Sequence, residues 1–110
     1  MDYIERLRRL ALNDTHLGDD HALEVQTQEL DPRTLALVRI AALVAIGGAQ
    51  PTYGAEADAA VGVGATGAEI VDVVAAIIPI VGLPCVVAAA PKLALALGVD
   101  VIESQDGEPA

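Results

Sequence analysis

The sequence predicts an all-α protein, folded as a single-domain helical bundle of about five to six helices. Apolar residues recur at the three- and four-residue spacing of a helix face, and Pro and Gly stand where helices would begin and end. No segment alternates apolar and polar residues for long enough to indicate a strand. At 110 residues the chain is long enough to form one hydrophobic core.

The first helix is predicted over residues 2–12, with Asp2 and Glu5 in the two positions of a capping box. The segment 13–29 is polar and uneven, so we expect a loop with at most a short helical turn there. The apolar side chains of the helix over residues 2–12 share one face, namely Ile4, Leu7, Leu10 and Ala11.

The pair Asp31–Pro32 predicts the next helix start, because Asp caps a helix and Pro at the first helical position loses no hydrogen bond. This helix should run to Ile46 and stop at Gly47–Gly48. A further helix should begin near Pro51 and end at residues 62–64.

Thr66 and Glu69 form the second predicted capping box, three residues apart as that motif requires. The helix that follows is expected to continue toward Val81. The segment Gly82–Pro84 should then break it and open a last helix that ends near Leu97.

Residues 62–67 also fit the G-x-G-x-x-G pattern of dinucleotide-binding turns. That pattern has meaning only after a strand and ahead of an acidic residue about 20 positions later. Here a helix is predicted before it, and residues 85–90 contain no acid. We therefore interpret it as a glycine-rich turn between helices.

The charges exclude nucleic acid as a partner, since acids outnumber bases by 16 to 6 and the net charge is −10. The stretch from Ile40 to Pro91 contains no Lys or Arg. So much uncharged surface predicts that a partner covers it, and we expect a homo-oligomer.

A membrane span is not expected, although residues 73–91 carry no charge. Pro79, Gly82 and Pro84 interrupt this run, and no aromatic or polybasic anchors flank it. The run is better explained as a buried helical hairpin. A lone Cys85 and the lack of a signal peptide predict a cytoplasmic protein.

Several of these signals occur in an order that resembles the carboxymuconolactone decarboxylase family, which also contains the alkyl hydroperoxidase D-type thiol peroxidases. They are Leu30-Asp31-Pro32-Arg33-Thr34, the helix that ends at Gly48, Gly64-Ala65-Thr66 before Glu69-Ile70, and Gly82-Leu83-Pro84 before an Ala-rich helix.

The resemblance implies a family-like helical core over residues 30–98, preceded by an N-terminal helix and polar connection over 1–29 and followed by an acidic tail over 99–110. It also implies assembly into trimers or hexamers.

The family's peroxidases carry Cys-x-x-Cys-x-x-x-His, and the matching positions here are Ala49, Thr52 and Glu56. Two-thiol redox chemistry needs a nucleophilic and a resolving thiol, which Ala and Thr cannot supply. The family's peroxidases also use an acidic relay residue on the preceding helix. The matching position here is Ala36 or Leu37, and neither side chain ionises. The departure from the motif predicts a degenerate site without thiol peroxidase activity.

The decarboxylase branch implies a reaction without metal or organic cofactor. Thr52, Tyr53 and Glu56 are the candidate catalytic residues, with Glu56 as general base and Tyr53 as donor. The alternative is that Glu56 is solvated and Tyr53 is half-buried packing.

Two further groups have reactive chemistry. Cys85 has apolar neighbours, so we expect its side chain to be buried and to pack in the core. His16, Asp20, His21 and Glu24 lack the spacing of a zinc site, and we expect no metal. His21 would line a pocket if the N-terminal segment folds over the helix that contains Tyr53.

Two functions from different classes remain at this point. One is a cofactor-free, lactone decarboxylase-like acid–base enzyme that binds an unidentified small molecule. The other is a non-catalytic, oligomeric binding or scaffold protein that retains the family fold.

Overall fold

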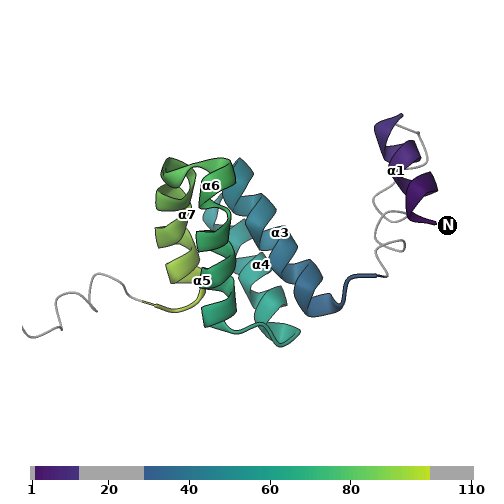
Figure 1. Cartoon of the computed structure of the whole chain (residues 1–110). Coiled ribbons are helices and arrows are strands. Elements are labelled where there is room, and N and C mark those ends of the chain that lie inside the picture. The colour runs from purple at the N-terminus through teal and green to yellow at the C-terminus, as the bar shows by residue number, and fades with distance from the viewer. Residues whose placement is uncertain (1, 13–28, 100–110) are drawn as a thin grey trace, which may run out of the picture. The chain divides into compact units, whose positions relative to one another are not determined.

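The structure is a computed structural model that describes residues 2–12 and 29–99. It divides into two compact units, Met1–Asp31 and Pro32–Ala110, which are considered separately (Figure 1). Every regular element in the described ranges is a helix, which confirms the all-α prediction. The predicted boundaries at residues 29 and 98 stay predictions. The helices are α1 (Tyr3–Ala11), α3 (Pro32–Ile46), α4 (Gln50–Gly62), α5 (Gly67–Ala76), α6 (Ile78–Val81) and α7 (Leu83–Ala96).

Helix α1 begins after Asp2, whose Oδ1 accepts a hydrogen bond of 2.8 Å from the Glu5 backbone N–H. Glu5 also forms an ion pair with Arg9, with 3.3 Å between Oε1 and Nε. No residue of this helix is buried. The aliphatic face that the sequence predicts is present, and its side chains Ile4, Leu7 and Leu10 are exposed.

Helices α3 and α4 begin and end where the sequence predicts. Pro32 is the first residue of α3, and Gly47 follows its last residue with φ of +83°, a left-handed conformation that favours glycine. Helix α4 ends at Gly62 and is followed by a turn in which Gly64 has φ of +98°. The G-x-G-x-x-G segment thus follows a helix and forms a turn between helices, as predicted.

The capping box at the start of α5 is confirmed. Thr66 Oγ1 accepts a bond of 3.1 Å from the Glu69 N–H, and Glu69 Oε1 accepts one of 2.9 Å from the Thr66 N–H. The second bond lowers the pKa of Glu69 below its ordinary value of 4.5, and the nearby guanidinium of Arg33 adds to this effect. Arg33 Nη1 lies 2.7 Å from Glu69 Oε2 and joins the first turns of α3 and α5.

One predicted boundary was wrong. The helix that follows Thr66 ends at Ala76 instead of continuing toward Val81, and the short helix α6 follows after Ile77. Pro79 explains the break, because it has no N–H to bond to the carbonyl of Ala75 and its ring would collide with that carbonyl.

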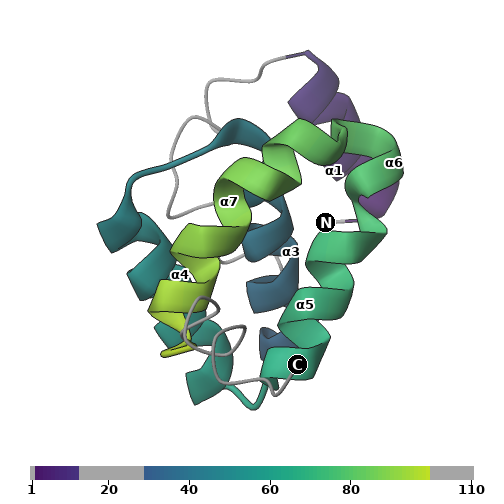
Figure 2. The same ribbon diagram turned by 90° about the vertical axis from the view of Figure 1, so that its left-hand side faces the viewer.

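Gly82 separates α6 from α7 with φ of +89° and ψ of 149°, a region that is essentially restricted to glycine. Helix α7 then begins at Leu83, with Pro84 in its first turn, and Gly98 follows its C-terminal cap with φ of +75°. The predicted last helix is confirmed. Helix α7 packs beside α3 and α4 (Figure 2).

Helix α3 is the centre of the second unit, since α4, α5 and α7 all pack against it. In the described residues the buried side chains are aliphatic apart from Tyr53, and no charged side chain is buried. Five of the thirteen buried core residues are alanines, which lets the helices approach closely: Ala36, Ala57, Ala60, Ala65 and Ala89.

No helix in the described part of the chain is long and apolar enough to span a membrane.

Candidate functional site

A small, partly open cavity of about 160 Å³ lies where α3, α4 and α7 meet. Most of its wall is aliphatic, but a phenol, a thiol and an ammonium group come from residues far apart in the sequence. The lining residues are Val44, Ala45, Ile46, Gly47, Tyr53, Cys85, Ala88, Ala89 and Lys92.

Tyr53 lies in the first turn of α4 and is only 2% exposed. Within the described residues its hydroxyl forms no hydrogen bond, which is uncommon for a buried polar group. Burial raises the pKa of the phenol above its ordinary value of 10.0, because the ionised form is poorly solvated there. At neutral pH Tyr53 is therefore a hydrogen-bond and proton donor, not a base.

Lys92 connects α7 to the loop between α3 and α4. Its Nζ donates a hydrogen bond of 2.9 Å to the carbonyl of Gly48, and Gln50 Nε2 donates one of 2.7 Å to the Lys92 carbonyl. The ammonium lies 5.9 Å from the centroid of the Tyr53 ring, close enough for a cation–π interaction. A positive charge thus stands beside the unpaired phenol.

Sequence reasoning did not assign Lys92 to the site. One signal was available: Lys92 is the only lysine of the chain and the only basic residue after Arg39. An isolated charge in an apolar segment usually has a specific partner. The sequence could not show that this partner would be a loop carbonyl more than 40 positions away.

Cys85 lies in the first turn of α7 and is half-buried. The prediction of buried packing was wrong, because the side chain is only half-buried and borders the cavity. Cys85 and Lys92 are seven residues apart and so share one face of α7, with Ala88 and Ala89 between them. These alanines leave the space that forms the cavity.

Of the predicted catalytic residues that lie in the described ranges, the structure brings only Tyr53 to this cavity. Thr52 is exposed, Glu56 is half-buried, and neither lines the cavity. The two are one helical turn apart on α4, whereas Tyr53 is turned toward the core. Their catalytic roles stay predictions.

His16 and His21 lie outside the described residues. Among the residues that the structure does describe, no group of three or more His, Cys, Asp or Glu side chains is arranged to hold a metal ion.

Comparison with known families decides which helical fold this is. The model of the carboxymuconolactone decarboxylase family matches residues 12–95. The chain belongs to this family. A search of curated proteins and a search of solved structures each found no significant match.

The family match covers α3 to α6 and nearly all of α7, and it leaves α1 outside. All three helices that form the cavity are therefore part of the carboxymuconolactone decarboxylase family core. Ala49, Thr52 and Glu56, the positions assigned to the peroxidase motif, lie at the cap and in the first two turns of α4.

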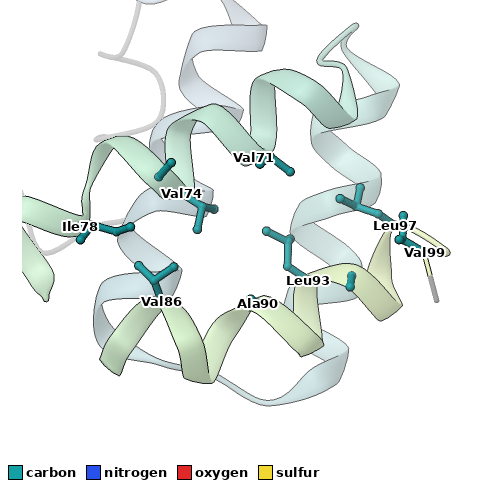
Figure 3. Close-up of a pocket in the computed structure, with 10 residues that line it drawn as sticks. Val71, Val74, Ile78, Val86, Ala90, Leu93, Leu97 and Val99 are labelled. Atoms are coloured by element: carbon teal, nitrogen blue, oxygen red, sulfur yellow. The ribbon is translucent and has the colours of Figure 1, made fainter. Parts of the chain in front are cut away.

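A second concavity in the carboxymuconolactone decarboxylase core is an apolar groove of about 330 Å³ between α5, α6 and α7. Figure 3 shows its aliphatic side chains facing the space between the helices. The groove contains no charged or hydroxyl side chain. Its lining residues are Val71, Val74, Ala75, Ile78, Val86, Ala90, Leu93, Ala94, Leu97 and Val99.

Proposed function

We propose that this family member is a cofactor-free acid–base enzyme of the lactone decarboxylase type. Its small-molecule substrate would bind in the cavity that Tyr53 and Lys92 line. The observation that carries this proposal is the buried Tyr53 hydroxyl, which has no hydrogen-bond partner among the described residues and a raised pKa. Perturbed groups in a concave site are typical of catalytic centres.

Each polar group has a role in such a reaction. The Tyr53 hydroxyl donates to a carbonyl oxygen that gains negative charge, and the Lys92 ammonium stabilises the same charge electrostatically. Glu56 remains the candidate base, three residues after Tyr53 on α4. Glu56 does not line the cavity. It could act as the base only on a substrate that extends out of the cavity to the Glu56 side chain.

Thiol peroxidase activity of the familial type is not part of this proposal. The positions of the two thiols and the histidine carry Ala49, Thr52 and Glu56, and the chain contains one cysteine. A single thiol has no resolving partner within its own chain. Peroxide consumption with a dithiol donor should therefore equal the rate without protein, and clear activity would contradict the proposal.

The test of the acid–base function is turnover of a panel of small lactones by the wild type, Tyr53→Phe and Glu56→Gln. Loss of the proton donor should lower kcat at least tenfold, with a smaller change in KM. Tyr3→Phe is the matched control, since Tyr3 is exposed on α1 and should leave turnover unchanged. Turnover that survives Tyr53→Phe undiminished would rule out this assignment.

A non-catalytic oligomeric binding or scaffold protein is the second candidate, and under either function the exposed aliphatic side chains support assembly. Ile80 is 86% exposed, and Leu83, Val87 and Leu95 are more than half exposed. We propose that copies of the chain cover this surface in a trimer or hexamer. Lactone turnover that Glu56→Gln does not change would favour the scaffold function.

A further inference from the structure

We propose that the cavity between α3, α4 and α7 also binds small α,β-unsaturated carbonyl compounds covalently, through the thiol of Cys85. The inference rests on the cavity of the proposed function but does not need acid–base turnover. Three groups that converge there carry it: a nucleophile, a hydrogen-bond donor without a partner, and a fixed positive charge.

The nucleophile is Cys85, the only thiol of the chain. It lies in the first turn of α7, at the end of the helix that borders the cavity. It is half-buried, so a molecule in the cavity can reach it while the bulk solvent has limited access.

The hydrogen-bond donor is Tyr53, which lines the same cavity from the opposite helix, α4. Leaving a buried hydroxyl without a hydrogen-bond partner costs free energy. A ligand oxygen that accepts from Tyr53 recovers this free energy. The unpaired hydroxyl is thus an observation independent of Cys85 that indicates an oxygen-bearing ligand.

The positive charge is the ammonium of Lys92, two helical turns after Cys85 on the same face of α7. Its bond to the Gly48 carbonyl uses one of its three protons and holds it at the cavity wall. The charge favours the enolate oxygen that forms during the reaction.

The reaction is a conjugate addition that balances without a further reactant. The thiol loses its proton to solvent, and the thiolate Sγ forms a bond with the β-carbon of the ligand. The π pair of the carbon–carbon double bond shifts into the bond between the α-carbon and the carbonyl carbon. The π pair of the carbonyl moves onto its oxygen, and the Tyr53 hydroxyl donates a hydrogen bond to this enolate oxygen. A proton from solvent then adds to the α-carbon, so the net change is addition of S–H across the double bond.

The cavity also sets the size and polarity of the ligand. Its volume of about 160 Å³ is below the 300–1,000 Å³ of drug-sized sites, so the ligand has few non-hydrogen atoms. The aliphatic wall from α3 favours an apolar body. A five-membered cyclic enone meets both conditions.

The experiment treats the full-length protein with cyclopent-2-en-1-one and follows adduct formation by intact-protein mass spectrometry. We expect one adduct per chain, located at Cys85 by peptide mapping and absent in Cys85→Ser. The folded protein should react at least tenfold faster than the same chain unfolded in urea at equal pH. An equal rate in the two states would overturn the inference.

Two substitutions test the roles of the neighbours. Tyr53→Phe should slow the addition about tenfold or more, as expected when one donor to a developing oxyanion is removed. Lys92→Met should slow it as well, and Tyr3→Phe is the matched control with an unchanged rate. Circular dichroism confirms that each variant is folded. A folded Tyr53→Phe variant that reacts at the wild-type rate would refute the role of the hydroxyl and with it the proposed site.

The two proposals fail separately. Adduct formation without turnover of any lactone removes the acid–base function and leaves the covalent site in place. Turnover of a lactone without accelerated adduct formation removes only the covalent site.

Discussion

Tyr53 places a hydroxyl in a core whose other buried side chains, within the described residues, are aliphatic. Sequence reasoning identified this residue as a donor because it lies between Thr52 and Glu56, two of the family's motif positions. Reasoning from the sequence could not find the cavity, which needs Ala88 and Ala89 of α7 to leave space opposite Tyr53. Which helix faces a given side chain is decided by tertiary packing, and one sequence does not encode that in a local pattern.

Removing the Tyr53 hydroxyl should therefore stabilise the protein. Tyr53→Phe keeps the ring and eliminates an unpaired polar group, so we expect the free energy of unfolding to rise by about 1 kcal/mol. Urea denaturation followed by circular dichroism measures this change. Tyr3→Phe, at an exposed position, should change stability by less than about 0.5 kcal/mol. A clear loss of stability in Tyr53→Phe would mean that the hydroxyl has a partner.

The raised pKa of Tyr53 gives a second prediction. Below pH 10.0 the phenol is neutral in both the folded and the unfolded state. As the pH rises above this value the unfolded chain ionises first, so the free energy of unfolding should fall. Unfolding midpoints in urea at several alkaline pH values measure the slope. Tyr53→Phe should make the free energy of unfolding less dependent on alkaline pH. An unchanged dependence would mean that other groups cause it.

At the scale of the helix, two glycines provide a matched pair. Gly82 adopts a backbone conformation that other residues rarely enter, so Gly82→Ala should destabilise the protein by about 1–3 kcal/mol. Gly54 lies inside α4, and a Cβ there would meet nothing within 4 Å, so Gly54→Ala should stabilise by about 0.5–1 kcal/mol. Thermal or urea unfolding measures the stability of both variants. If Gly82→Ala and Gly54→Ala changed the free energy of unfolding in the same direction, the conformational argument would be contradicted.

The capping box of α5 gives another prediction for an element. Thr66→Ala removes the acceptor for the Glu69 N–H and should cost about 1 kcal/mol of stability. Thr52→Ala is the control, because Thr52 is exposed and forms no cap. Glu69 contributes stability above its ordinary pKa of 4.5, and that contribution is lost as the pH falls through its lowered pKa. Equal urea midpoints for the two variants at neutral pH would argue against the cap.

Helix boundaries were the most predictable part of this fold because their signals are local. An Asp or Thr cap, a proline in a first turn and a glycine after a last turn each act within a few residues. The one error, the helix extended to Val81, arose because the apolar periodicity runs on through Pro79, although Pro79 cannot donate the backbone hydrogen bond that would continue α5. The grouping of Cys85 with Lys92 and Tyr53 had no comparable local signal.

For the whole molecule, we predict that a charge placed on the exposed aliphatic surface dissociates the assembly. Ile80 is the most exposed of these side chains, so Ile80→Lys should shift the sedimentation of the protein toward the single chain. Ala59→Lys, at an exposed position on α4, is the matched control and should leave the sedimentation unchanged. Wild-type protein that sediments as a single chain at micromolar concentration would contradict the proposed oligomer.

The alanine-rich core has a further effect on this molecule. Because alanine buries little apolar area, each protomer gains less hydrophobic free energy than a core of larger side chains would provide. If neighbouring copies supply the difference, folding and assembly form one equilibrium, and the melting temperature depends on how much protein is present. Dilution alone should then act as a denaturant, whereas a self-sufficient protomer would melt at one temperature at every concentration.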